Sequence, residues 1–196
     1  MQRRNFIRKS TAVLGLAGLA VAGCTTNRNA GGEQAAGAAD LHRSIDADVD
    51  STLQRLYATV GGSRELVAKA NGVLVFPSVI QAGLVVGAQY GKGALRAGGH
   101  TVGYYSTTSG SFGLQAGAQS KALIFLFMTQ DALNKFRSSN GWSAGADASV
   151  ALVRMGANGT IDTTTATKPV QAFVLTNAGL MADASIEGTK VSRLTE

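Results

Sequence analysis

The chain has 196 residues and a formal net charge of +6, and its charges are unevenly distributed. Four of its 18 Lys and Arg residues lie in the first ten positions, and no acidic residue precedes Glu33. The part that follows Cys24 keeps 14 basic and 12 acidic residues, a net charge of only +2. A nucleic-acid-binding protein presents clustered basic residues within its folded domain, so we expect no nucleic-acid partner.

Residues 1–23 have the layout of an export signal. Met1–Lys9 is basic, Thr11–Ala22 is uncharged, and small residues precede Cys24, the chain's only cysteine. This order is typical of a secretory signal, and the apolar run is shorter than the roughly 20 residues that span a bilayer. Val21–Cys24 resembles the lipobox of bacterial lipoproteins, so we predict a lipid anchor, such as palmitate, on Cys24. A single cysteine excludes a disulfide within one molecule.

Two further features concern export and location. Arg3-Arg4 followed by Phe6 and Ile7 resembles the twin-arginine export signal, and both this route and the general secretory route stay open. Thr25, in place of Asp, resembles lipoproteins that are sorted to the outer membrane of Gram-negative bacteria. We therefore predict a bacterial envelope protein that is anchored to the outer membrane and faces the periplasm.

Residues 24–40 are small and polar, which predicts a flexible tether, and residues 41–196 form one domain. Its first element is a helix over residues 41–60, because apolar residues recur at helical spacing from Leu41 to Val60. Four aspartates lie on or beside this helix, whereas a membrane-surface helix is rich in Lys and Arg. We therefore expect it to pack on its own domain. Ser63 is a predicted N-cap for a second helix, Arg64–Ala70.

After Gly72 the pattern is typical of strands, and 25 glycines with only two prolines indicate close backbone approach. In the strand expected over 82–96, the glycines fall on odd positions, so one face lacks side chains. The apolar run Val73–Phe76 ends at Pro77. The further strands are expected at 101–107, 111–119, 121–129, 142–154, 160–167, 170–176, 180–187 and 190–194, with a hairpin turn at Asn158-Gly159.

Only one helix, over residues 129–137, interrupts these strands, which argues against a parallel sheet. We predict an α+β fold: an antiparallel, glycine-rich and barrel-like sheet, an N-terminal helical segment, and one short helix between strands.

Charge is one-sided along the first strands. No acidic residue occurs between Glu65 and Asp131, whereas four basic residues do: Lys69, Lys92, Arg96 and Lys121. One interpretation is a shallow positive surface for phosphate groups. The other is that strands have little room for charge and that these four side chains do not converge. The sequence leaves both open.

The sequence contains fragments of catalytic motifs, but each lacks residues or context that its chemistry requires. Gly141–Gly145 matches the G-x-S-x-G nucleophile motif, but a helix precedes it and no histidine follows His100. Gly91–Gly93 lacks the remainder of a phosphate-binding loop. His42 and His100 are isolated, so no cluster of metal ligands is evident. We predict no enzymatic activity, no cofactor and no metal.

Several segments together resemble the SYLF-domain family: Gly72–Val79, Ala82–Gly93, Thr101–Ser106, Gly110–Lys121, and Gly141-Trp142 with the segment to Asp147. The resemblance extends from about Ser63 to Leu194. It implies a domain that binds lipids, with phosphoinositides as the eukaryotic ligands. Some fungal members also bind actin, which we do not expect in a periplasm. The resemblance implicates Lys92, Arg96 and Lys121 in lipid binding, with Lys69 as a further candidate.

The leading hypothesis is therefore a lipoprotein whose domain binds phospholipids with anionic or phosphoinositide-type headgroups through these cations. A variation places an acyl chain against an apolar face made by Phe76, Leu84, Val86 and Leu95. The alternative is an interaction module that holds another envelope protein through a sheet edge or through a surface containing Tyr104, Tyr105 and Trp142.

Overall fold

The computed structural model describes residues 30–82, 86–112, 119–155, 161, 168–181 and 185–195. The predicted signal, Cys24 and the first residues of the tether lie outside this part of the chain. Helix α1 runs from Ala30 to Thr59, so residues 30–40, which we predicted as tether, are helical. Alanine has the highest helix propensity of all residues, and this segment continues directly into the predicted helix at 41–60.

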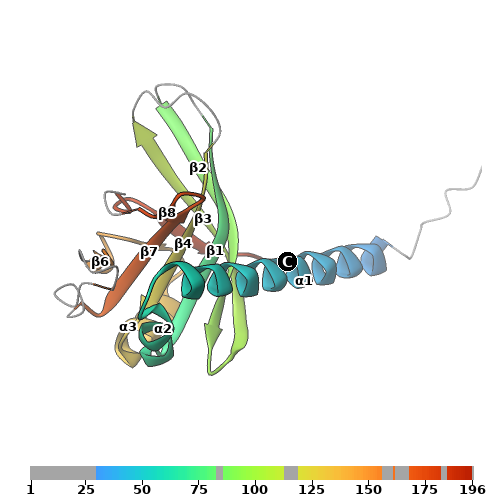
Figure 1. Cartoon of the computed structure of the whole chain (residues 1–196). Coiled ribbons are helices and arrows are strands. Elements are labelled where there is room, and N and C mark those ends of the chain that lie inside the picture. The colour runs from blue at the N-terminus through green and yellow to red at the C-terminus, as the bar shows by residue number, and fades with distance from the viewer. Residues whose placement is uncertain are drawn as a thin grey trace, which may run out of the picture.

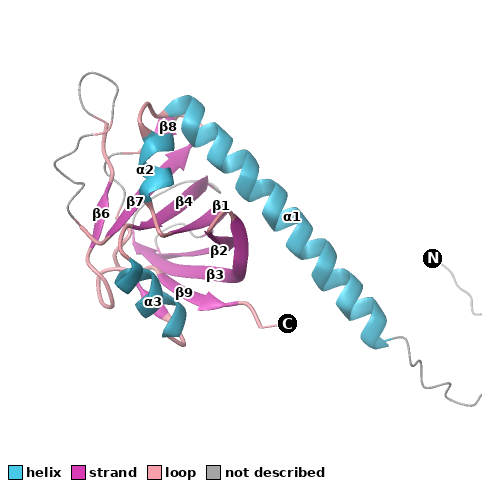
Figure 2. Ribbon diagram, turned by 90° about the horizontal axis from the view of Figure 1, so that it is seen from below, coloured by secondary structure: helices cyan, strands magenta, loops and turns pink. Residues whose placement is uncertain are grey.

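Helix α1 packs on its own domain, as the distribution of its acidic residues indicated. Ile45, Val49, Leu56 and Val60, the last of which directly follows the helix, are at most 5% exposed and contact one face of the sheet. Figures 1 and 2 show α1 crossing the outside of the curled sheet, with its N-terminal end extending beyond it. Among the described residues, no helix combines the length and the apolar character that a bilayer span requires.

Helix α2 (Ser63–Lys69) begins one residue earlier than predicted, and its N-cap is Gly62 with φ 82°. Ser63 is therefore not the cap that we expected. Its buried hydroxyl instead donates hydrogen bonds to the carbonyl oxygens of Val60 (2.6 Å) and Leu56 (3.2 Å). It thus satisfies acceptors at the end of α1, which a helix C-terminus leaves without partners.

The described strands form one sheet in the order β5-β9-β3-β2-β1-β4-β7-β6, with β8 also paired to β7. Their bounds are β1 Gly72–Ala82, β2 Val86–Ala97, β3 His100–Phe112, β4 Gln119–Phe127, β5 Trp142–Ser143, β6 Val150–Leu152, β7 Val170–Thr176, β8 Gly179–Leu180 and β9 Lys190–Arg193. All described strand pairs are antiparallel except β6 with β7. The sheet curls into a half-barrel (Figure 2), which confirms the predicted α+β fold.

Helix α3 (Gln130–Ser138) was also predicted, and Thr129 caps it by accepting a hydrogen bond from the backbone N–H of Ala132. The strand expected over 142–154 is wrong, because a turn at Gly145 (φ 92°) separates β5 from β6. Of the strand expected over 180–187, the described residues form strand only at Leu180, in β8. The strand expected over 111–119 is also wrong where the structure describes it. Residues 111 and 112 are the last two of β3, and Gln119 is the first residue of β4. Several predicted segments lie outside the described residues: Asn158-Gly159, residues 113–118 and 182–184, and the strand expected over 160–167 except Ile161.

Strand β1 continues through Pro77, where the sequence predicted its end. The pairing of β1 shifts register at this point, between Val75 and Ser78 toward β2 and between Phe76 and Val79 toward β4. A bulge tolerates proline because the bulged residue makes no regular ladder bond. Because of this extra residue, the side chains that follow the bulge point to the opposite faces from those that uninterrupted alternation would give. Phe76 and Val79 therefore both point inward, and Ser78 points outward.

Two apolar cores lie on opposite faces of the sheet. The inner face packs against α3 and Trp142, and its core contains, among others, Leu74, Phe76, Leu95, Tyr105, Leu123, Phe125, Phe127, Leu133 and Phe136. The outer face packs against α1, and its core contains, among others, Val73, Val75, Ala94, Ala122, Ile124, Leu126, Phe173 and Leu175. The sequence read these residues as strand interiors without assigning them to two separate cores.

Two glycines of β2, Gly91 and Gly93, allow β1 to approach closely in the curled sheet. A Cβ atom on Gly93 would lie 2.0 Å from the carbonyl oxygen of Val75 and 2.7 Å from Cδ1 of Phe76. One on Gly91 would lie 2.8 Å from the carbonyl oxygen of Ser78. At Gly91 and Gly93, β1 therefore covers the face of β2 that lacks side chains.

Candidate functional site

The four predicted cations do not converge on one surface. Lys92 and Arg96 lie on the outer face of β2, because both share the face of the buried outer-core residue Ala94. Lys121 lies on β4 opposite Val79, on the inner face. Lys69 is the last residue of α2 and lies next to the start of β1. Lys92 lies opposite Ser78, much further along β1. The interpretation of these four residues as one positive surface is therefore wrong.

Arg96 is engaged within the protein. Its guanidinium is 2.8 Å from a carboxylate oxygen of Asp50 and 3.5 Å from one of Asp46, both on α1. The side chain is only 21% exposed. Asp46 also accepts hydrogen bonds from the hydroxyls of Thr101 (2.6 Å) and Tyr104 (2.8 Å). We call these five residues the α1 clamp, because they join α1 to strands β2 and β3.

Tyr104 belongs to this clamp and not to an exposed aromatic surface. Burial, with the hydrogen bond and the negative charge of Asp46, raises the pKa of Tyr104 to about 12. Its ring stacks on His42 with centroids 3.7 Å apart. Tyr105 and Trp142 are 6% and 3% exposed, within the inner core. The surface of Tyr104, Tyr105 and Trp142 that the alternative hypothesis used for protein binding is therefore not formed.

The apolar face expected for an acyl chain is likewise part of the packed interior. Phe76 and Leu95 are fully buried in the inner core, and Phe76 contacts Phe125 edge to face. Leu84 lies outside the described residues, as does the side chain of Val86. What the structure describes of this face leaves no room for a chain next to Phe76.

Lys121 is partly buried at the inner face. Desolvation lowers the pKa of its ammonium group. No hydrogen bond or ion pair joins Lys121 to another residue of the described chain. Its nitrogen still reaches solvent, because Nε of Arg96 is the only buried side-chain polar atom without a partner among the described residues.

A different surface emerges on the outer face beyond α1. Strand register places two cross-strand rows there, one from β9 to β4 and one directly beside it. We call these residues the outer patch: Lys190, Thr108, Tyr90, Ile80 and Ser120 in the first row, and Ser192, Ser106, Lys92 and Ser78 in the second. Ile80 is 54% and Tyr90 48% exposed, the two highest values among the large apolar side chains described.

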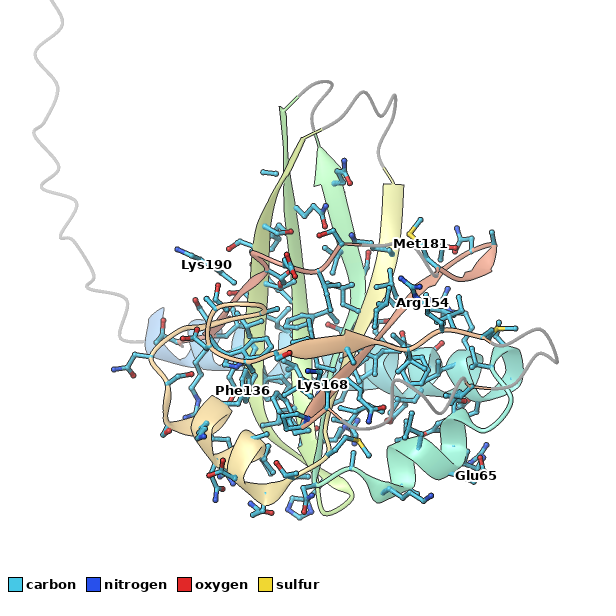
Figure 3. All side chains as sticks on the ribbon, turned by 90° about the vertical axis from the view of Figure 1, so that its left-hand side faces the viewer. Glu65, Phe136, Arg154, Lys168, Met181 and Lys190 are labelled. Carbon is cyan, nitrogen blue, oxygen red and sulfur yellow. The ribbon has the colours of Figure 1, made fainter. Side chains whose placement is uncertain are left out.

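The composition of the outer patch is specific. It combines two lysines, two large apolar side chains and hydroxyls, and it contains no acidic residue. Strand geometry places Lys92 and Lys190 about 12 Å apart. Figure 3 shows Lys190 extending away from the body of the molecule. Ser78 and Ser120 hydrogen-bond to each other (2.8 Å), which satisfies two hydroxyls across β1 and β4.

Sequence reasoning found Lys92 but missed its neighbours. Lys190 reaches the patch only because β9 pairs with β3, where it lies opposite Thr108. Ile80 was placed on no face, because the bulge at Pro77 changes the alternation of β1. The sequence indicated this patch in one respect only: Tyr90 and Lys92 are two residues apart in a segment predicted as a strand, so they share a face.

The structure also contains a groove of about 370 Å³ between α1, α2 and the β2–β3 turn. It is lined by Asp50, Leu53, Tyr57, Val67, Ala68, Ala70, Asn71, Val73, Arg96, Ala97, Gly98 and Gly99. Its charged groups, Arg96 and Asp50, neutralise each other. The groove therefore offers no unpaired charge to a ligand.

The residues of the rejected catalytic motifs have structural roles. Ser143 lies in β5, and its backbone N–H donates a hydrogen bond to Asp147. Gly91–Gly93 is strand and not a loop. Within the described residues, no group of three or more potential metal ligands comes together.

Comparison with known proteins adds an independent observation. Residues 108–196 match the model of the Ysc84 (SYLF) family, which is described as a Las17-binding protein actin regulator. The match covers less than half of the chain and shows that this part is similar to the SYLF family. The match confirms the resemblance from the last five residues of β3 through β9, including the outer-patch residues Thr108, Ser120, Lys190 and Ser192. The SYLF family consists of binding domains, so the match implies a lipid- or actin-related binding module. No curated protein matches the chain.

Proposed function

We propose that this protein is a non-enzymatic envelope lipoprotein whose SYLF domain binds an anionic phospholipid surface through the outer patch. Cys24 carries the lipid anchor, and the protein faces the periplasm from the outer membrane. The observation that supports this function best is the outer patch itself. Two lysines that make no ion pair within the described residues flank exposed Tyr90 and Ile80, in a patch that contains no acidic residue.

The chemistry of the patch suits a bilayer surface. A lysine near an anionic membrane contributes about 1 kcal/mol, so Lys92 and Lys190 together contribute about 2 kcal/mol. Transfer of the exposed parts of Ile80 and Tyr90 into the interface adds about 1–2 kcal/mol. The total corresponds to a dissociation constant in the millimolar range.

Such weak binding suits a tethered domain. Five residues separate Cys24 from the start of α1 at Ala30. A short tether gives an effective concentration in the millimolar range. Contacts of a few kcal/mol are then sufficient to keep the domain on the bilayer. Palmitate labelling and membrane fractionation of wild-type protein and Cys24→Ser test the anchor and its location.

Vesicle co-sedimentation tests the patch. The protein is residues 25–196, which include every element that the structure describes. The variant Lys92→Gln with Lys190→Gln is expected to bind anionic vesicles at low salt about 10- to 30-fold more weakly, from the loss of about 2 kcal/mol. The matched control is Lys69→Gln with Lys168→Gln. It makes the same charge change at two exposed lysines outside the patch.

The outcomes separate clearly. The control pair retains most of the binding if the patch is the site. Equal loss in both pairs would show that net charge alone drives binding. No binding of wild-type protein to anionic vesicles at low salt, where charge contacts are strongest, contradicts the proposed function.

A protein partner is the second candidate, and the family description, which names Las17 binding, favours it. The described sheet ends in two short strands, β5 and β6, so its edges offer little room for strand addition. Met155 and Met181 are 42% and 40% exposed, and methionine is common at adaptable binding surfaces. Crosslinking in intact cells distinguishes the candidates, since one dominant protein adduct supports this alternative.

A further inference from the structure

The hydroxyl group of Tyr105 reaches solvent at the margin of the inner core, although its ring is buried. The ring packs against Phe136 of α3 with centroids 5.0 Å apart. No described residue hydrogen-bonds to the hydroxyl, and Nε of Arg96 is the only buried side-chain polar atom without a partner among the described residues. Gly103, two residues earlier in β3, leaves space beside this hydroxyl, because a Cβ atom there would lie 3.4 Å from its oxygen.

Two arginines lie beside this hydroxyl. Arg193 of β9 is directly opposite Tyr105 of β3 and shares its face of the sheet. Arg137 follows Phe136 in the last turn of α3. Burial raises the pKa of Tyr105, and the positive charges of Arg193 and Arg137 act against that rise. Both guanidinium groups are therefore close enough to influence the hydroxyl. Figure 2 shows α3 and β9 at the same edge of the half-barrel.

The charge at this position is not balanced within the described chain. Both arginine side chains are exposed, and neither Arg137 nor Arg193 makes an ion pair or a side-chain hydrogen bond with a described residue. The charged groups that act on Tyr105 are both positive. Arg96, by contrast, is paired with two carboxylates of α1. Like charges that lie close together repel each other, so a bound anion would stabilise this arrangement.

We propose that Arg137, Arg193 and the hydroxyl of Tyr105 bind a carboxylate group of an acidic protein segment. A guanidinium group presents paired N–H donors that match the two oxygens of a carboxylate, and the hydroxyl adds a further donor. Arginine and tyrosine are also enriched among the residues that dominate protein–protein binding. A domain that docks on a bilayer through the outer patch turns this opposite face away from the lipid. The carboxylate therefore comes from a soluble partner, a step that rests on the proposed function.

Calorimetric titration of residues 25–196 at low salt tests the site. The probe is a capped hexaglutamate peptide, and a capped hexaglutamine peptide is its neutral control. The variant Arg137→Gln with Arg193→Gln is expected to bind hexaglutamate at least about tenfold more weakly, because charge-assisted hydrogen bonds are the strong ones. Tyr105→Phe keeps the buried ring and is expected to weaken binding about threefold. The matched control, Lys92→Gln with Lys190→Gln, makes the same charge change in the outer patch and retains the affinity.

Vesicle co-sedimentation of the same variants separates this site from the outer patch. The arginine variant is expected to keep its affinity for anionic vesicles. Its melting temperature is expected not to fall, because two exposed like charges without described partners are removed, and this shows that the variant folds. Failure of wild-type protein to bind vesicles contradicts the proposed function and leaves the hexaglutamate readout unchanged.

Four results overturn the carboxylate site. The first is wild-type protein that binds hexaglutamate no better than hexaglutamine. The second is an arginine variant that binds hexaglutamate as tightly as wild type. The third is an equal loss in the arginine and lysine variants, because net charge alone then drives binding. The fourth is an arginine variant that loses vesicle binding and keeps peptide binding, because the arginines then contact lipid phosphate.

Discussion

The α1 clamp allows a direct test of whether Arg96 stabilises the fold or contacts lipid. Replacing Arg96 with Met keeps most of the apolar stem and removes the guanidinium group. The loss includes a charged hydrogen bond of 2.8 Å to Asp50 and a longer contact to Asp46. Charged hydrogen bonds contribute about 1.5–3 kcal/mol when shielded. Asp50 is 58% exposed, and exposed ion pairs contribute less, so we expect a loss of about 1–2 kcal/mol.

For a domain of this size, that loss lowers the melting temperature by roughly 3–6 °C. Asp46 still accepts two hydroxyl hydrogen bonds, which limits the penalty of its unpaired charge. Thermal unfolding of Arg96→Met beside Lys92→Gln gives the comparison, because Lys92 is exposed and makes no described ion pair. Vesicle co-sedimentation of both variants completes it. An unchanged melting temperature with weaker vesicle binding for Arg96→Met would refute the clamp and restore Arg96 as a lipid contact.

Two further predictions concern packing and pH. Gly93→Ala places a Cβ atom 2.0 Å from the carbonyl oxygen of Val75, and such overpacking costs about 3 kcal/mol or more. Gly110→Ala, in a strand position with no atom within 4 Å of the new Cβ, is expected to leave the denaturation midpoint nearly unchanged, and an equal loss in both contradicts the close approach. The pKa of Tyr104 is raised from 10 to about 12, so its contribution is complete below pH 10 and disappears as the pH rises to about 12. Urea titrations between pH 9 and 12 should show a steeper alkaline loss for wild type than for Tyr104→Phe, and identical slopes would contradict the assignment.

The sequence predicted the fold class and several elements because their patterns are local. β7 coincides with the predicted strand over 170–176, and α3 lies within one residue of its predicted bounds. The predicted end of β1 at Pro77 was wrong. Proline normally ends a central strand, but β1 continues through Pro77 because a bulge accommodates it there. The start of α1 was missed because alanine and glycine carry no apolar periodicity, so helical residues 30–40 had the composition of a linker.

The candidate site was less predictable, because it depends on faces and pairings. Lys92 and Lys121 both lie in strands that the sequence identified, yet they point to opposite sides of the sheet. Alternation with a period of two places Lys92 on the outer face with Ala94, and Lys121 on the inner face with Leu123. Lys190 joins Lys92 only through the pairing of β9 with β3. No local pattern records such a pairing between residues so distant along the chain.

The sequence by itself determined that this chain forms a glycine-rich sheet with an N-terminal helix, that its basic residues concentrate in the first ten positions, and that it resembles a SYLF domain. The sheet, the helix and the charge distribution follow from composition and from patterns over a few residues, which short-range sterics and hydrophobicity decide; the family comes from the resemblance alone. Tertiary structure alone decided the surroundings of the charges: Arg96 pairs with Asp46 and Asp50 of α1, Lys92 lies near Lys190 on the outer patch, and Lys121 lies on the inner face. Charge partners depend on strand register and on the curl of the sheet, which arise only when distant segments pack together.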